Sequence, residues 1–141
     1  MLGRLSDAEE QALADYGRYA GLAFQLVDDL LDFTASPLQL GKPVLSDLKE
    51  GKVTLPLIYA LESDRAVGDR MVRTVLEEKG FHSVRADQIS ALVRNSGAVE
   101  RTRALANDYA SRAKACLNGH AATEFGRALY AVPDFILDRE H

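Results

Sequence analysis

The sequence has little that would form a disulfide, span a membrane or direct secretion. Its 141 residues include one cysteine, four prolines and no tryptophan. A lone cysteine excludes an internal disulfide, and Cys116 has the spacing of a small residue inside a helical core. No apolar run approaches the ~18 residues of a membrane span. The opening residues, with Arg4 and then several acids, do not resemble a signal peptide. We therefore expect a cytoplasmic protein without a membrane span.

The charge balance excludes a second class of function. Seventeen Lys and Arg face 21 Asp and Glu, a formal net charge of -4, and no basic run interrupts the pattern. Nucleic-acid binders present clustered basic residues, so we expect no nucleic-acid partner. The 47% hydrophobic and 27% charged residues are typical of a globular chain. Residues 1–141 are therefore expected to form one domain with a core.

Helical spacing of apolar residues dominates what remains. Ser6 and Glu9 have the spacing of a capping box, which predicts the start of a long helix. Pro37, Gly41 and Pro43 interrupt the pattern after it. No convincing strand pattern occurs. We predict an all-α fold with helices at about 7–33, 54–63, 65–79, 84–94, 98–117 and 121–138.

Within the first predicted helix, the segment FQLVDDLLDF places three aspartates among apolar neighbours. On a helix, Asp28 and Asp32 lie one turn apart, and Asp29 is also a neighbour of Asp32. Carboxylates this close repel, and burial penalises their charge unless they find a partner. A hard cation solves both problems, and Mg²⁺ prefers carboxylate, phosphate and water oxygens. The segment predicts an open Mg²⁺ site that a substrate phosphate completes.

Acids on a helix more often form a solvated face, and that alternative stays open for this spacing alone. The next segment, GKPVLSDLKEGKVTLPLIYALE, favours a site instead. It brings Lys42, Asp47, Lys49 and Lys52 shortly after the aspartates, and lysines are mobile point charges that suit phosphate oxygens. Together the two segments predict metal ligands and counter-charges for a diphosphate.

These two segments resemble the trans-prenyl diphosphate synthases, the polyprenyl synthetase family. GLAFQLVDDLLDF is similar to the second aspartate-rich motif of the family, and GKPVLSDLKEGKVTLPLIYAL to the segment after it. The tail, with SGAVERTRALANDYASRAKACL and ALYAVPDFILDREH, is similar to the closing helices of long-chain members, such as octaprenyl, solanesyl and decaprenyl synthases. The resemblance implies a helical bundle of the isoprenoid synthase type and a Mg²⁺-dependent condensation of isopentenyl diphosphate with an allylic diphosphate.

The resemblance also implies roles for particular residues. Asp28 matches the main metal ligand of the motif, and Asp29 and Asp32 match its remaining acids. Lys42 and Lys52 match positions that contact the allylic diphosphate. The other matching positions are an acid that supports the metal and lysine network, a glutamine that lines the reacting centre and an aromatic residue beside it: Asp47, Gln25 and Phe24.

The sequence departs from the family by having one aspartate-rich cluster where the family has two. The upstream Arg and Lys residues that bind isopentenyl diphosphate are also missing. We therefore expect the C-terminal half of a synthase, inactive alone, which forms a homo-oligomer or associates with a missing N-terminal half. Two alternatives stay open. The chain could be a non-catalytic diphosphate-binding or partner subunit of a heteromeric synthase, or a helical interaction protein with solvated acids.

Overall fold

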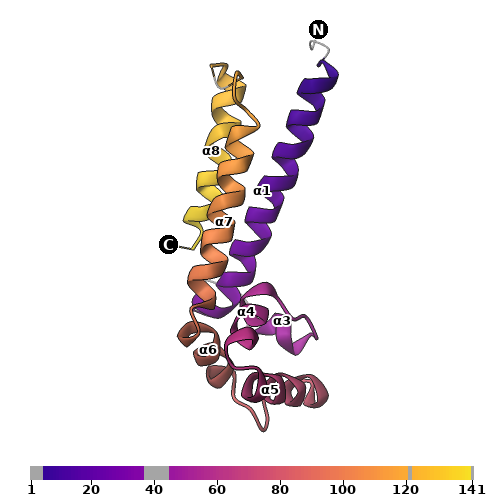
Figure 1. Cartoon of the computed structure of the whole chain (residues 1–141), viewed down its shortest axis with the longest axis vertical. Coiled ribbons are helices and arrows are strands. Elements are labelled where there is room, and N and C mark those ends of the chain that lie inside the picture. Colours follow the sequence, from indigo (N-terminus) through magenta and orange to yellow (C-terminus); the bar gives the residue numbers. More distant parts are fainter. Residues whose placement is uncertain (1–4, 37–44, 121, 141) are drawn as a thin grey trace. The chain divides into compact units, whose positions relative to one another are not determined.

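The computed structural model describes residues 5–36, 45–120 and 122–140, and over these ranges it contains helices and turns but no strand (Figure 1). The all-α prediction is confirmed. None of the helices in these ranges is long and apolar enough to cross a membrane. The helices are α1 (Asp7–Thr34), α3 (Ser46–Lys49), α4 (Leu55–Ser63), α5 (Arg65–Glu78), α6 (Ala86–Asn95), α7 (Ala98–Ala115) and α8 (Glu124–Asp138).

Contacts between residues divide the chain into two compact units. The first holds the described residues up to Val27 together with Leu105–Arg139, and the second holds Asp28–Ala104 together with Glu140. The division therefore falls inside two helices, α1 and α7, each of which contributes to both units. Asp28, Asp29 and Asp32, near the end of α1, belong to the second unit.

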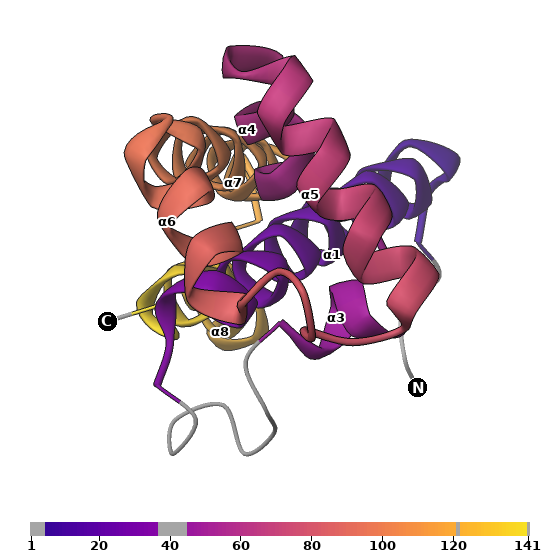
Figure 2. The ribbon, with the colours of Figure 1, turned by 90° about the horizontal axis from the view of Figure 1, so that it is seen from below.

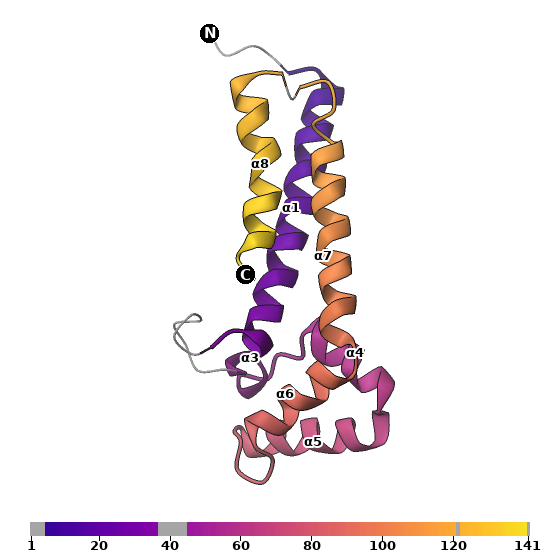
Figure 3. The same ribbon diagram turned by 90° about the vertical axis from the view of Figure 1, so that its left-hand side faces the viewer.

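In the first unit, the early part of α1, the later part of α7 and the whole of α8 run side by side (Figure 3). The predicted capping box starts α1: the Ser6 amide donates to Glu9 Oε2 at 2.8 Å, and the Glu9 amide donates to Ser6 Oγ at 3.2 Å. Stacked rings join α1 to α7, with the centroids of Tyr19 and Tyr109 6.0 Å apart. An ion pair of 2.6 Å between Lys114 Nζ and Asp134 Oδ1 joins α7 to α8.

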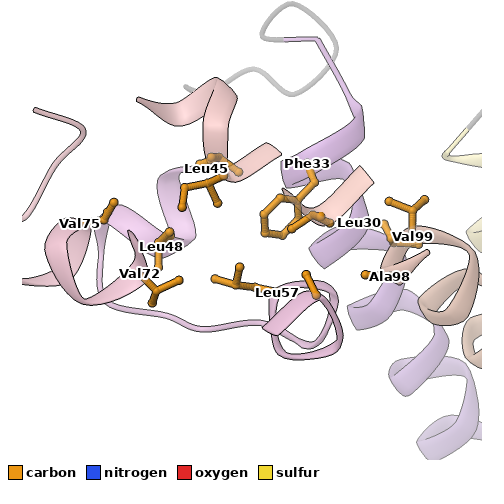
Figure 4. Close-up of a cluster of buried hydrophobic side chains, with 12 residues drawn as sticks. Leu30, Phe33, Leu45, Leu48, Leu57, Val72, Val75, Ala98 and Val99 are labelled. Atoms are coloured by element: carbon orange, nitrogen blue, oxygen red, sulfur yellow. The ribbon is translucent and has the colours of Figure 1, made fainter. Parts of the chain in front are cut away.

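In the second unit, α3 to α6 pack with the end of α1 and the start of α7 around one apolar cluster (Figures 2 and 4). Gly68 allows α5 to approach α4 closely, because an added Cβ would lie 2.5 Å from Leu61 Cδ2. The buried members of the cluster are Leu30, Phe33, Leu45, Leu48, Leu57, Ala60, Val72, Val75, Ile89, Val93, Ala98 and Val99. Because Leu30 and Phe33 belong to it, this cluster fixes the end of α1 that carries the aspartates.

The six predicted helices are all present, with shifts at their ends that have physical causes. The start of α8 moves from residue 121 to Glu124 because Thr123 caps it, with Oγ1 accepting the Gly126 amide at 2.9 Å. Likewise α6 starts at Ala86, where Gln88 Oε1 accepts the Arg85 amide at 2.8 Å. Pro56 lies in the first turn of α4, where a missing amide hydrogen removes no helical hydrogen bond.

Two local features lie beyond the predicted pattern. The left-handed position that ends α5 is held by Lys79, with φ 52°, although Gly80 follows it, and the Gly80 amide donates to the Val75 carbonyl at 3.2 Å. That bond spans six residues, which places the left-handed residue one position earlier. Helix α3 was not predicted, because four residues are too few to show a periodic pattern.

Candidate functional site

The three aspartates lie on one continuous helix, as predicted, but they differ in exposure. At about 100° per residue, Asp28, Asp29 and Asp32 occupy an arc of about 100° around α1. Asp32 is 0% exposed and Asp29 is 7% exposed, whereas Asp28 is half-buried. The interpretation as a solvated acidic face is therefore wrong for Asp29 and Asp32.

The neighbouring residues explain why the helix can bury acids here. Leu30 and Phe33 point into the apolar cluster of the second unit (Figure 4), and they are 0% and 4% exposed. Tertiary packing therefore determines the register of this end of α1, and the aspartates follow from that register. Of the three carboxylates, Asp28 is the one that a ligand from solvent can reach most easily.

The segment after α1 is fixed to the same end of the helix. The Leu45 amide donates to the carbonyl oxygen of Asp32 at 3.4 Å, and α3 starts at the next residue. Asp47 lies in the first turn of α3 and is half-buried. Its carbonyl accepts the Lys52 amide at 2.8 Å, across a turn in which Gly51 has φ 91°. The backbone thus connects the aspartates to the segment that carries Asp47 and Lys52.

Of Lys42 and Lys52, the structure describes only Lys52. Lys42 lies outside the described residues. Lys52 Nζ lies 3.7 Å from Glu50 Oε2, and both side chains are well exposed. An ion pair this exposed contributes little to stability, so it leaves the ammonium available to a stronger anion. The predicted contact of Lys52 with a diphosphate stays a prediction.

Phe24 and Gln25 precede Asp28 by about one turn and are both exposed. The Phe24 ring, 46% exposed, lies under the guanidinium of Arg139, which is 4.4 Å from its centroid. Such a cation–π contact at an exposed position stabilises by about 0.5–1 kcal/mol. The sequence contains no signal for this contact, since 115 positions separate the two residues and neither belongs to a pattern that includes the other.

The donor set fits a cation that is only partly held by protein. Within the described ranges, no three His, Cys, Asp or Glu side chains gather closely enough to hold a metal ion by themselves. A closed metal cage is therefore not formed by these residues. Carboxylates with one accessible member suit Mg²⁺, which keeps several waters and takes phosphate oxygens as further ligands.

Comparison with known proteins identifies the family. The profile of the family described as Polyprenyl synthetase matches residues 1–93. The octaprenyl diphosphate synthase of Escherichia coli is 38% identical over 141 residues, which are 99% of this chain and 43% of that protein. Component 2 of the heptaprenyl diphosphate synthase of Geobacillus stearothermophilus is 38% identical over 106 residues, which are 74% of this chain and 31% of that protein.

A solved structure extends the likeness to the fold. The polyprenyl synthase of Caulobacter crescentus, complexed with calcium and isoprenyl diphosphate, matches with a TM-score of 0.86 and 35% identity. The match covers 97% of this chain and 42% of that one. The chain thus spans less than half the length of the curated relatives it matches, from 26% to 43%. The family profile covers two thirds of the sequence and includes the aspartate segment, so the chain belongs to the polyprenyl synthetase family.

Proposed function

We propose that this chain supplies the second aspartate-rich half of the active site of a polyprenyl diphosphate synthase. The reaction is the condensation of isopentenyl diphosphate with an allylic diphosphate. The observation that carries the proposal is the burial of Asp29 and Asp32 beside a more accessible Asp28, on a helix end to which Leu45 ties the next segment. The calcium and isoprenyl diphosphate in the Caulobacter relative support it, because that ligand pair has the chemistry expected here.

The roles of the residues follow the family motif, and the positions of Asp28, Asp29, Asp32, Asp47 and Lys52 allow them. Asp28 binds Mg²⁺ directly, and Asp29 and Asp32 act from the buried side of the same arc, directly or through water. Bound Mg²⁺ supplies positive charge to the diphosphate that leaves the allylic carbon. Lys42 and Lys52 bind the same diphosphate, and Asp47 orients this network. Charges aimed at the leaving group favour the transition state over the ground state.

The family motif also assigns roles to Gln25 and Phe24, which lie about one turn before Asp28 on the same helix. Their exposure leaves them able to contact a substrate, and Arg139 holds the Phe24 ring. We assign Phe24 to the wall beside the reacting carbon and Gln25 to a polar contact with it. Both assignments follow the family motif.

The resemblance implies two aspartate-rich motifs in a complete active site, whereas the sequence holds only one such cluster. We therefore further propose that turnover needs a second motif. The chain would then act as the C-terminal part of a polyprenyl synthetase domain, in association with a complementary N-terminal half or within a homo-oligomer. A second candidate function is a non-catalytic, diphosphate-binding subunit of a heteromeric synthase. It is favoured by the relative from Geobacillus stearothermophilus, whose name describes one component of an enzyme.

Both candidate functions require Mg²⁺-dependent binding of a diphosphate. Calorimetric titration with Mg²⁺ and inorganic pyrophosphate tests this binding. The chain should bind pyrophosphate only when Mg²⁺ is present, and Asp28→Asn should weaken this binding. The matched control is Asp108→Asn, since Asp108 is an exposed acid on α7 that pairs with Arg112 at 2.9 Å. Equal binding by the two variants, or no Mg²⁺-dependent binding by the unaltered chain, would contradict the proposal.

A further inference from the structure

Leu45 combines two properties that rarely occur together. Its backbone is left-handed, with φ 59° and ψ 28°, and its side chain is 0% exposed. The left-handed conformation brings Cβ of an L-residue against the following carbonyl, so glycine, asparagine and aspartate usually take it. A bulky residue persists there only where the surrounding structure over-determines its conformation.

Contacts on both sides of Leu45 account for its conformation. Its amide donates to the carbonyl of Asp32 at 3.4 Å, and its own carbonyl accepts the Lys49 amide at 3.2 Å. Its side chain lies in the apolar cluster of the second unit, close to Leu48 in Figure 4. The core therefore holds the side chain while the backbone turns from the end of α1 into α3.

This turn determines where the next polar residues lie. Asp47 follows two positions after Leu45, and the Lys52 amide is bonded to the Asp47 carbonyl at 2.8 Å. Helix α3 has only four residues, which is too short to be stable by its own hydrogen bonds. Its position against the aspartate end of α1 thus depends on a tertiary anchor, and Leu45 is the buried residue at its first boundary.

We infer that Leu45 is a positioning residue: its left-handed backbone and buried side chain together hold the α3 segment, with Asp47 and Lys52, against the aspartate end of α1. This inference rests on the proposed function for its chemical meaning, because that segment is the proposed diphosphate-binding side of the site. Leu57 provides a matched comparison, since it is also 0% exposed in the same cluster but lies inside the regular helix α4.

The first experiment tests the backbone strain through the order of two variants. In a helix, glycine is less stable than alanine, so Leu57→Gly should melt at a lower temperature than Leu57→Ala. At Leu45 the order should reverse, because glycine adopts positive φ without steric conflict and alanine does not. Thermal unfolding of the four variants measures this. The same order at both positions would overturn the inference.

The second experiment tests positioning through amide hydrogen exchange. The reporters are the amides of Lys49, Glu50, Gly51 and Lys52, which are all hydrogen-bonded in the α3 segment. Leu45→Ala should speed their exchange by about tenfold or more relative to α6 amides, whereas Leu57→Ala should change both groups alike. Unchanged relative protection of the reporters in Leu45→Ala would overturn the inference.

A gentler pair keeps the test decisive should Leu45→Ala fail to fold. Valine retains most of the buried volume, but its β-branch fits the left-handed region badly. Leu45→Val should therefore release the reporter amides, and Leu57→Val should not. If both leave the reporters protected alike, Leu45 is an ordinary core residue and the inference fails.

Pyrophosphate titration with Mg²⁺ links the result to the site. Leu45→Ala should weaken binding by about fivefold or more, while Leu57→Ala, at a similar loss of thermal stability, should stay within about twofold. Equal weakening by the two variants would overturn the inference. Absence of binding by the unaltered chain would contradict the proposed function instead, and hydrogen exchange would still decide the role of Leu45.

Discussion

The hydroxyl of Tyr16 donates a hydrogen bond of 2.5 Å to the carbonyl of Leu129, the carbonyl that Pro133 leaves without its helical donor. In an α-helix the carbonyl of residue 129 accepts from the amide of residue 133, and proline has no amide hydrogen. Tyr16 is 8% exposed, so its hydroxyl meets the orphaned acceptor inside the first unit. A side chain of α1 thus provides the hydrogen bond that the Leu129 carbonyl of α8 lacks within its own helix.

Tyr16→Phe should therefore destabilise the chain by about 1–3 kcal/mol, because it leaves a sheltered carbonyl unsatisfied. Urea-induced unfolding measures the change. In a double-mutant cycle, Pro133→Ala returns the helical donor, so Tyr16→Phe should cost less in that background. Tyr130→Phe is the control, since Tyr130 is 42% exposed. Equal costs of Tyr16→Phe in the two backgrounds would show that the hydroxyl does not replace the missing amide.

Asp28→Ala should lower kcat by at least ~100-fold in the proposed synthase, assayed with a second aspartate-rich half supplied. Removing one oriented electrostatic group commonly raises the barrier by about 3–4 kcal/mol. Lys52→Ala should raise KM for the allylic substrate and lower kcat as well. Steady-state kinetics at saturating Mg²⁺ measure these changes, with Asp108→Ala as the surface control. Similar kinetics for Asp28→Ala and Asp108→Ala would remove Asp28 from the proposed site.

The purified chain alone should not form a prenyl product from isopentenyl diphosphate and an allylic diphosphate. The proposed function needs a second aspartate-rich motif, and the sequence holds only one such cluster. An assay with radiolabelled isopentenyl diphosphate and Mg²⁺ measures product directly. Robust Mg²⁺-dependent product from the 141-residue chain would show that one cluster suffices.

Cys116 should react slowly with thiol reagents at neutral pH. Burial, and next the charge of Asp15, raise the pKa of its thiol, so less thiolate is present at any given pH than for a small free thiol. The residue also lines a mainly apolar cavity of about 130 Å³ with Leu13 and Leu117. Labelling with a chromogenic disulfide should accelerate with pH and reach the rate of glutathione only in urea. A native rate equal to that of glutathione would contradict the raised pKa.

Local patterns were enough to predict most of the helices. The capping box of Ser6 and Glu9 and the breakers after Phe33 bound α1 closely, because caps and prolines act within a few residues. The shared helix of Asp28 and Asp32 followed from spacing for the same reason. Their roles as metal ligands stay predictions that rest on the family resemblance.

Features that depend on contacts distant in sequence could not be predicted. The helical spacing of Asp28, Asp29 and Asp32 can be read from the sequence. Their unequal burial cannot, because it depends on packing against residues distant in sequence. The left-handed backbone of Leu45 could not be predicted either, because leucine rarely adopts this conformation. The contact of Arg139 with Phe24 likewise arises only in the folded chain.

The bond between Tyr16 and Leu129 imposes an order on evolutionary change. A proline that arrived at position 133 before a donor existed at position 16 would have left a sheltered carbonyl unpaired. A lineage could therefore acquire Tyr16 first and Pro133 afterwards, and could lose them only in the reverse order. Homologues should accordingly show proline at 133 chiefly where position 16 carries a hydroxyl donor, whereas tyrosine at 16 can occur with any residue at 133.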